Sequence, residues 1–487
     1  MRKKDKAEVQ QLARHLGNLG ERLDKFLRFE HPDAMVTRQQ WLGGITSHCP
    51  EQGRPIDSVL DDFYTHVLPN GAPVTHPGFS SFITTGPSTI GVVASAASSL
   101  ASPQRVGKTA FNYLEELSLD WMANLFCLND NMRGVYCSGG STANIVALGA
   151  ARQSAFEAIG VDPAQSGIDR PAIIYASRAC HRTIHRAASV LGLGRSAVVE
   201  VDARTDGTIV PHALATRIER DLQQGGFPVA IVVNAGVTST GAIDDIAAIA
   251  DIAESHNIWL HVDGAYGLPG ILDPTMRDLY SGIDRAQSVI VDPHKWLGAP
   301  VGIGAVYVHD RSLLQRTFEQ GSSDYFEGAF NEELTAHSLD SQGIPYSDFA
   351  LELSSPARGA VVWALLCEVG KAGLRERICR HNAMAQHIAE RARAEASLQL
   401  LLEPTLSITC FRYIGASGAM NNSNDAINQL NRSIHRQLLI NNKNMPSTTM
   451  IDGKLALRPC FVGARTSYDY ADRLVDEVLK IGAALTR

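Results

Sequence analysis

The chain has 487 residues, of which 45% are apolar and 20% charged, and its formal net charge is −7. This length accommodates two or three domains with a large core, and the negative charge argues against broad affinity for nucleic acid or an anionic membrane surface. The first residues are basic but lack the apolar segment of a signal peptide, and no apolar run approaches the roughly 18 residues that span a bilayer. We therefore expect a cytoplasmic protein with neither a membrane nor a nucleic acid as its partner.

The cysteines are spread along the chain without CxxC pairs and without the density of a disulfide scaffold. Their positions are Cys49, Cys127, Cys137, Cys180, Cys367, Cys379, Cys410 and Cys460. We expect reduced and mostly buried thiols. No spacing of His and Cys residues indicates a metal site.

Leucines recur at helical spacing near the start of the chain, and the pattern predicts an amphipathic helix over residues 7–29. Its apolar side must pack against the same chain or against a second copy. From Gly134 to Val308, short apolar runs alternate with helical patterns. The predicted strands are "RGVYC", "PAIIYAS", "AVVEV", "VAIVVNAG", "IWLHVDGAYG", "SVIVD" and "GIGAVYV". This alternation predicts a mostly parallel sheet covered by helices.

Beyond Arg358, the sequence predicts a long helix, "ARGAVVWALLCEVG", and then a small α/β domain. That domain would contain the strands "LSITCFRY" and "KLALRPCFV" and the final helix "SYDYADRLVDEVLKIGAAL". Between Glu319 and Leu353 periodicity is weak, and long loops of this kind are usually functional or mobile.

A glycine-rich turn joins a predicted strand to a helix in "GVYCSGGSTANIVAL". Glycines let backbone N–H groups approach a ligand, and a helix start offers unpaired donors, so Ser138–Ser141 is a candidate anion cradle. A plain turn with serine as a helix cap is the alternative. The stretch matches neither GxxxxGK[ST] nor GxGxxG, which argues against nucleotide sites of those kinds.

Two charged residues follow buried strands. Asp263 ends "IWLHVD" and Lys295 follows "SVIVDPH", where an unpaired charge is costly. Asp263 alone is also compatible with an ordinary turn or helix cap. A parallel sheet brings the carboxyl ends of its strands to one edge, where ligands of open α/β sheets bind. Together with the glycine cradle, the pair meets the needs of pyridoxal phosphate: a phosphate site, an amine for the aldehyde and a carboxylate for the ring nitrogen.

The chain also resembles the group II pyridoxal-phosphate-dependent amino acid decarboxylases, which include aromatic-L-amino-acid, glutamate and cysteine-sulfinate decarboxylases. "DPHKWLG" resembles the family's His-Lys signature and "WLHVDGAYG" its aspartate strand. The similarity extends over most of the chain, through "THPGFSSF", "SGGSTANIVALGAAR", "ACHRTIHRAASVLG", "NAGVTSTGAIDDI" and "GKLALRPCFVGARTSYDYADRL".

The resemblance implies a fold of type I (aspartate aminotransferase-like), with an N-terminal helical segment (1–85), a large cofactor-binding domain (86–370) and a small C-terminal α/β domain (371–487). It also implies a homodimer with sites at the subunit interface, and the helix over 7–29 would pack on the partner.

The resemblance assigns roles by position. Lys295 is similar to the lysine that forms the Schiff base, and His294 to the histidine beside the phosphate. Asp263 matches the partner of the pyridine nitrogen, and Ala265 packs on the ring. His181 matches the histidine that stacks on the ring face, where it is placed to orient or protonate a substrate group.

Other positions contact the cofactor or the substrate by the same resemblance. Gly140, Ser141 and Asp292 fall where phosphate contacts are expected, although many relatives carry asparagine at the third position. A carboxylate there would repel a phosphate unless it is bonded to His294 or a hydroxyl. The candidates on the substrate side are His76, Phe79, Phe82 and Thr238, and the last of these also lies near the ring.

Tyr325, in "GSSDYFEGAF", falls close to a loop tyrosine that the family links to protonation at Cα. Its presence favours simple decarboxylation over oxidative release of an aldehyde. An exposed loop aromatic is the alternative.

The expected reaction is decarboxylation of an L-amino acid to the amine and carbon dioxide, with an aromatic or largely apolar side chain favoured, because no arginine arrangement suits an acidic one. The alternatives are an acidic amino acid decarboxylase, a decarboxylation-dependent aldehyde synthase, another fold type I enzyme such as an aminotransferase, and an interaction protein without catalysis.

Overall fold

The computed structural model describes residues 3–30, 38–45, 48–101, 109–319, 346–415 and 423–486. The chain divides into two compact units, Met1–Phe79 and Ser80–Arg487, and each is described by itself. Apart from Phe79, which begins a strand, the regular elements in the described part of the first unit are helices and helical turns. Its elements are α1 (Lys3–Phe26), α2 (Arg38–Gly43), α3 (Ile56–Asp62), the π-helical turn η1 (Phe63–Val67) and the 3-10 turn η2 (Leu68–Asn70).

The helix α1 confirms the amphipathic helix predicted over residues 7–29, shifted a few residues toward the N-terminus. Arg14 pairs with Asp57 at 3.0 Å, which links α1 to α3. Leu12 and Leu16 of the apolar stripe nevertheless stay exposed. The described residues therefore cover the stripe only in part.

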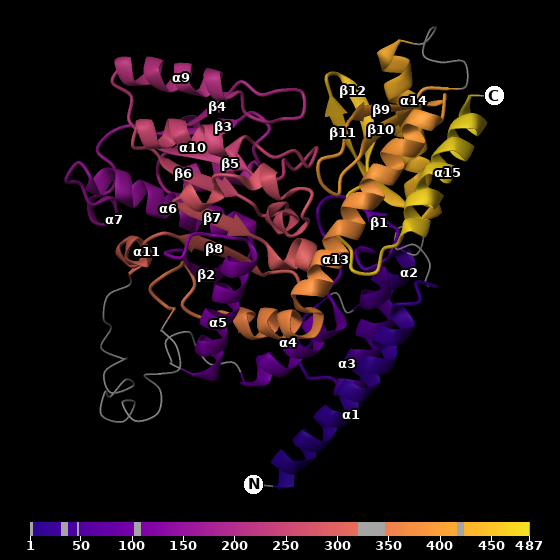
Figure 1. Cartoon of the computed structure of the whole chain (residues 1–487). Helices are drawn as coiled ribbons and strands as arrows, with labels where there is room; N and C mark the ends of the chain where they lie inside the picture. The colour runs from indigo at the N-terminus through magenta and orange to yellow at the C-terminus, as the bar shows by residue number, and fades with distance from the viewer. Residues whose placement is uncertain are drawn as a thin grey trace. The chain divides into compact units, whose positions relative to one another are not determined.

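A seven-stranded sheet forms the centre of the second unit, in the order β2-β8-β7-β6-β5-β3-β4 (Figure 1). The strands β3 to β7 run parallel, and β8 pairs antiparallel with both β2 and β7. The seven strands match the seven predicted ones: β2 (Arg133–Cys137), β3 (Ile173–Ser177), β4 (Val198–Val201), β5 (Pro228–Asn234), β6 (Trp259–Asp263), β7 (Ser288–Val291) and β8 (Gly304–Val308). Their near-continuous apolar sequences reflect burial on both faces.

Helices cover this sheet. The longer ones are α4 (Thr89–Ala101), α5 (Ala110–Leu125), α6 (Gly140–Glu157), α8 (Thr183–Val190), α9 (Pro211–Gln223), α10 (Ile246–Ser255) and α11 (Arg311–Phe318). Short helical turns complete the connections: α7 (Pro163–Ser166), η3 (Arg195–Ala197), η4 (Leu268–Leu272), η5 (Arg277–Tyr280), η6 (Ile283–Arg285) and η7 (Pro293–Leu297). The helix α6 packs across β2 and β5 to β8. Small buried residues of α6, among them Ala143, Ala147 and Ala150, allow this close approach to the sheet.

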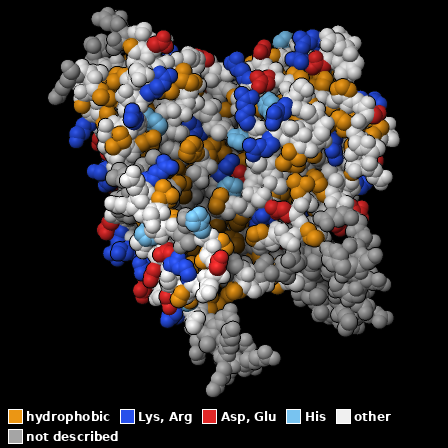
Figure 2. Space-filling view, turned by 180° about the vertical axis from the view of Figure 1, so that it is seen from behind, with side chains coloured by type: hydrophobic (Ala, Val, Ile, Leu, Met, Phe, Trp, Pro, Cys, Tyr) orange, Lys and Arg blue, Asp and Glu red, His pale blue; other side chains and the backbone are white. Residues whose placement is uncertain are grey.

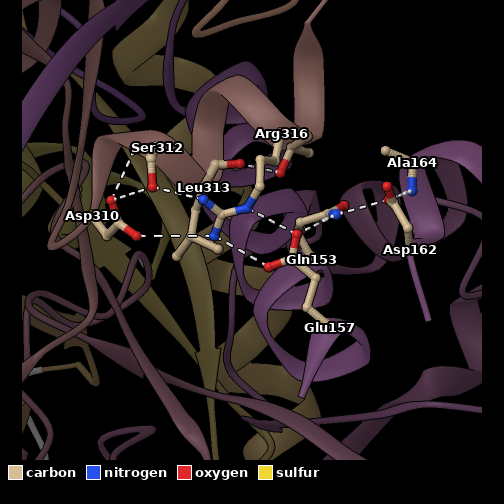
Figure 3. A network of polar contacts seen from close by, with 9 residues as sticks. Gln153, Glu157, Asp162, Ala164, Asp310, Ser312, Leu313 and Arg316 are labelled. Atoms are coloured by element: carbon tan, nitrogen blue, oxygen red, sulfur yellow. Dashed lines mark hydrogen bonds and ion pairs between the residues drawn. The ribbon is translucent and has the colours of Figure 1, made fainter. Parts of the chain in front are cut away.

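Polar contacts fix α11 to the end of α6 (Figure 3). Arg316 donates to both carboxylate oxygens of Glu157, at 2.9 and 3.2 Å, and Gln153 joins Glu157 to Asp162, the cap of α7. This hydrogen bond from Gln153 is the main reason that the pKa of Asp162 lies below its ordinary value. These contacts hold α11, the end of α6 and the start of α7 together.

A second, smaller sheet has the order β1-β11-β12-β10-β9. Its strands are β1 (Phe79–Ser80), β9 (Leu398–Leu402), β10 (Cys410–Tyr413), β11 (Met445–Ile451) and β12 (Lys454–Arg458). Three helices accompany it: α13 (Arg358–Ala394), α14 (Asn424–Asn441) and α15 (Tyr468–Leu485). The long helix α13 runs from α4 and α5 to this sheet (Figure 1) and departs from helical geometry at Gly370. The predicted domain borders after residues 85 and 370 stay predictions.

The cysteines are free, but the expectation that most thiols are buried is wrong. Cys137, Cys180, Cys410 and Cys460 are buried, whereas Cys49, Cys127 and Cys367 are exposed and Cys379 is intermediate. The described residues contain no cluster of His, Cys, Asp and Glu that fits a metal ion, and none of their helices is long and apolar enough to cross a membrane. On the face seen in Figure 2, basic and acidic side chains are interspersed among apolar ones.

Because His261 and His381 are buried, we predict that the free energy of unfolding falls at acidic pH. Burial lowers the pKa of His261 from 6.5 to about 4 and that of His381 to about 3. Below pH 6.5 the unfolded chain takes up protons that the folded chain does not, so stability falls as the pH falls toward the folded-state pKa. Between pH 7 and pH 5 we expect each histidine to lower the free energy of unfolding by about 2 kcal/mol, measured by urea denaturation.

The variant His381→Asn provides the control for this prediction. The ring Nδ1 of His381 accepts from the indole Nε1 of Trp296 at 2.9 Å, and an asparagine oxygen can replace that acceptor without titrating. The loss of stability between pH 7 and pH 5 should shrink by about half in this variant, because one of the two groups no longer binds a proton on unfolding. An unchanged loss would contradict the assignment to His381.

Candidate functional site

A cavity of about 470 Å³ lies in the second unit, where the carboxyl ends of β5, β6 and β7 meet the start of α6. This is the edge at which open α/β sheets bind ligands. Nine predicted residues line the cavity: Gly140, Ser141, His181, Thr238, Asp263, Ala265, Asp292, His294 and Lys295. The structure therefore brings together residues spread over more than 150 positions of the sequence.

The turn between β2 and α6 is open to an anion. Gly139 caps α6 with φ +138 and provides no side-chain cap, so the predicted alternative of a serine cap is not what the structure contains. A Cβ at Gly140 would lie 2.7 Å from Oδ2 of Asp292, and one at Gly139 would lie 3.1 Å from the ring of His294. Both positions therefore require glycine, and the first N–H groups of α6 remain available to a ligand.

Lys295 lies in η7, directly after β7, with 21% of its side chain exposed. Its Nζ pairs with Oδ2 of Asp292 at 3.0 Å. Of the described lysines, it alone lines the cavity. Lys295, a charged residue that follows a buried strand, thus lines the cavity, and its partner is Asp292.

Asp292 is almost fully buried, and its Oδ1 has no hydrogen-bond partner among the described residues. Gly140 and Gly304 make room for its carboxylate, since a Cβ on either would come within 2.7 Å of one of its oxygens. His294 approaches Oδ2 only to 3.9 Å, while its Nδ1 lies 2.6 Å from the carbonyl of Ile303. A carbonyl can only accept, so Nδ1 of His294 carries a proton.

Asp263 ends β6 and is buried at the base of the cavity. Its Oδ1 accepts from the backbone N–H of Ala265, and its Oδ2 accepts from Nδ2 of Asn144, each at 3.2 Å. Among the described residues, no lysine or arginine forms an ion pair with this carboxylate. Its negative charge is therefore available to a cationic group in the cavity.

His181 lies two residues before the first residue of α8, and its Nδ1 contacts Oγ1 of Thr183 at 2.8 Å. Burial is the main cause that lowers its pKa below the ordinary value, and Lys295 acts in the same direction, whereas Asp263 raises it. His181 is therefore neutral near pH 7. His185 does not line the cavity, and its Nε2 lies 3.7 Å from Glu200.

Arginines shape the surroundings without lining the cavity. The guanidinium of Arg458 donates to the carbonyls of Thr238, Ser239 and Phe82, which fixes the loop that carries Thr238. Arg358 donates to the carbonyl of Gly302 at 2.9 Å and pairs with Glu352. These contacts to backbone carbonyls are structural.

Three predicted substrate-side residues, His76, Phe79 and Phe82, are not among the described residues that line the cavity. His76 and Phe79 belong to the first unit, where the ring of His76 lies edge-on to that of Phe29. Phe82 belongs to the second unit, with φ +56 and 69% of its surface exposed. Tyr325 lies outside the described residues.

Further polar residues that were not predicted line the cavity, among them Asn144 and Thr183. The buried His261, which also was not predicted, contacts Asn144. A signal did exist for His261, because it is a polar residue in an apolar strand, two positions before Asp263, and alternate residues of a strand point to the same face. The partners of these side chains could not be read from the sequence.

Comparisons with known proteins agree on one family. The family model described as "Pyridoxal-dependent decarboxylase conserved domain" matches residues 39–414. An aromatic-L-amino-acid decarboxylase from Bacillus atrophaeus is 28% identical over 445 residues, covering 90% of this chain and 87% of the relative. Human cysteine sulfinic acid decarboxylase is 31% identical over 287 residues, covering 58% and 56%. A solved rice (Oryza sativa) TDC with PLP and tryptamine superposes with a TM-score of 0.86 at 21% identity, covering 100% of this chain and 99% of that one.

Proposed function

Because the chain belongs to the pyridoxal-dependent decarboxylase family and is a pyridoxal-phosphate-dependent amino acid decarboxylase of fold type I, we propose which residues perform the reaction and which substrates they accept. We propose that Lys295 binds the cofactor's aldehyde, that Asp263 faces its ring nitrogen, and that the substrate is an aromatic or largely apolar L-amino acid. One observation carries the proposal. The amine of Lys295, the carboxylate of Asp263 and the open start of α6 share one cavity.

The residues present fit pyridoxal phosphate. A volume of about 470 Å³ lies within the range of small-molecule sites. Gly139 and Gly140 leave backbone donors at the start of α6, where a helix favours a phosphate. We assign Gly140, Ser141 and His294 to the phosphate end of the site. Asp292 more naturally serves Lys295, with which it pairs, since its carboxylate would repel a phosphate.

When bound, pyridoxal phosphate accepts the electrons of the broken Cα–carboxylate bond. Asp263 would hold a proton on the ring nitrogen by its charge, and the small side chain of Ala265 would allow the ring to lie close. His181, neutral and at the cavity surface, would cover the ring and donate a hydrogen bond toward the substrate. Thr238 would line the substrate side.

The charge of the cavity supports the choice of substrate. No arginine lines it within the described residues, and its one lysine is assigned to the cofactor. An acidic side chain needs a cationic partner when it leaves water. We therefore keep His76, Phe79 and Phe82 as proposed contributors to a largely apolar substrate pocket.

A panel of amino acids tests this proposal. Holoenzyme is incubated separately with L-tryptophan, L-tyrosine, L-phenylalanine, L-glutamate, L-aspartate and cysteine sulfinate, while carbon dioxide, amine, aldehyde and keto acid are measured. We expect amine and carbon dioxide from at least one aromatic substrate, with kcat/KM at least about a hundredfold above that for the acidic ones. Turnover confined to the acidic substrates would overturn the substrate class, and keto acid without carbon dioxide would overturn the reaction.

The same panel bears on Tyr325, which we propose as the donor of the proton to Cα. A tyrosine that protonates Cα yields amine, so amine should exceed aldehyde. If Tyr325→Phe left this ratio unchanged, the tyrosine would have no such role.

We also propose that the enzyme is a cytoplasmic homodimer. The exposed leucines of α1, Leu12 and Leu16, support a further contact along this helix. Light scattering should give a molar mass of twice that of the chain.

A further inference from the structure

A chain of buried polar contacts runs from the interior of the sheet to the cavity. It begins on β6, where the indole Nε1 of Trp259 donates to Oγ of Ser288 at 2.8 Å. Oγ of Ser288 lies 2.8 Å from Nδ1 of His261, and Nε2 of His261 lies 2.9 Å from Oδ1 of Asn144. Asn144 then reaches both Asp263 and Thr183.

The chemistry of the groups fixes the direction of these hydrogen bonds. Both hydrogens of Nδ2 of Asn144 are used, toward Oδ2 of Asp263 at 3.2 Å and Oγ1 of Thr183 at 3.1 Å. Its Oδ1 must then accept, so Nε2 of His261 carries that ring's proton. Nδ1 of His261 accepts from the hydroxyl of Ser288, which in turn accepts from Trp259. His261 is buried and neutral at pH 7, since burial lowers its pKa to about 4.

The hydrogen bond from Asn144 to Thr183 determines which ring nitrogen of His181 carries the proton. Oγ1 of Thr183 accepts from Asn144, so its own hydrogen is free to point to Nδ1 of His181, 2.8 Å away. The backbone N–H of Thr183 donates to the same Nδ1 at 3.3 Å. Nδ1 therefore acts as an acceptor, and the single proton of neutral His181 resides on Nε2.

We propose that Asn144 is a positioning residue that holds the carboxylate of Asp263 and, through Thr183, keeps the proton of His181 on Nε2, the nitrogen left to face cofactor or substrate. This inference rests on the roles proposed for Asp263 and His181. It adds that one amide, that of Asn144, orients both residues. The hydrogen bond from Nε2 of His261 to Oδ1 of Asn144 fixes the orientation of that amide. An asparagine at this position performs both tasks because it offers two donors on one side and an acceptor on the other.

The experiment compares Asn144→Ala with Asn382→Ala. Asn382 is a matched control, because it is equally buried and its Nδ2 donates to an aspartate, Asp273, at 2.9 Å, away from the cavity lining. We expect Asn144→Ala to lower kcat roughly tenfold to a hundredfold with KM changed less than about threefold. Asn382→Ala should lower the melting temperature and leave kcat unchanged.

A second readout does not depend on turnover. In protein labelled with 15N-histidine and free of cofactor, NMR distinguishes the two neutral tautomers of His181, assigned by comparison with His181→Gln. We expect the Nε2–H form in the wild type, and a shift toward a mixture in Asn144→Ala and Thr183→Val. In Thr183→Ser, which keeps the hydroxyl, the Nε2–H form should return.

Each outcome decides between the inference and its premise. An unchanged tautomer and unchanged kcat in Asn144→Ala would overturn the inference, while the proposed function would stand if Asp263→Asn still lowered kcat. Full activity in both Asn144→Ala and Asp263→Asn would instead overturn the proposed role of Asp263 itself.

Discussion

Replacing Lys295 by alanine should abolish decarboxylation, with kcat lowered roughly a thousandfold or more. The protein should also lose its visible cofactor absorbance on dialysis. The reason is that, within the described residues, no other lysine lines the cavity that could take its place. Absorbance spectra before and after dialysis, together with carbon dioxide release, measure both effects. Retention of the absorbance by dialysed Lys295→Ala protein would rule out Lys295 as the covalent anchor.

Two further variants separate chemistry from folding in this experiment. Lys295→Ala leaves the buried carboxylate of Asp292 without its partner, which is costly by itself. Lys295→Arg keeps a positive charge beside Asp292, but its guanidinium stays protonated and cannot attack an aldehyde. It should therefore fold and remain inactive. Lys371→Ala, which removes an exposed lysine of α13, should retain both absorbance and activity.

The pairing of Lys295 with Asp292 also explains why the "DPHKW" stretch tolerates an aspartate. From the sequence, Asp292 was a doubtful phosphate contact, and the proposed rescue was a bond to His294. In the structure His294 instead binds a backbone carbonyl with Nδ1, and the carboxylate turns to the lysine. Asp292 can thus hold the amine in the cavity before the cofactor binds.

Most of the fold could be predicted because its signals are local. The seven strands of the large sheet are short apolar runs between helical patterns, and all seven were identified. In the smaller sheet, β1, β9, β11 and the helix α14 were missed. The strand β11, "MPSTTMI", has polar residues at its centre and no strict alternation, whereas α14, "NDAINQLNRSIHRQLLIN", does place the buried Ile427, Ile434 and Leu438 at helical spacing, so a signal for the helix was present.

The grouping of the main site residues in one cavity could also be predicted. Lys295, Asp263 and Gly140 each follow or begin an element whose type was clear, and the geometry of a parallel sheet places such positions together. The second layer of polar contacts was not predictable, since it depends on which side chain of α6 faces β6. Asn144 lies within an alanine-rich helix, and only the packing of α6 on the sheet brings its amide to Asp263.

The second large effect on kcat is expected from a substitution at Asp263. We expect Asp263→Asn to lower kcat roughly a hundredfold to a thousandfold while the cofactor remains bound. The variant keeps the shape of the side chain but removes the negative charge, which is the feature that favours a protonated ring nitrogen and hence electron withdrawal. It also places an amide where two donors, from Ala265 and Asn144, now meet a carboxylate.

The loss of a hydrogen bond alone should destabilise the fold by about 1 to 3 kcal/mol, and a control must separate this from the loss of charge. Asp273→Asn provides it, because Asp273 is likewise buried and accepts from an asparagine, Asn382, without lining the cavity. Both variants should melt earlier, but only Asp263→Asn should lose kcat while its cofactor absorbance survives dialysis. If kcat fell equally in the two, the effect would be one of stability, and Asp263 would have no special relation to the ring.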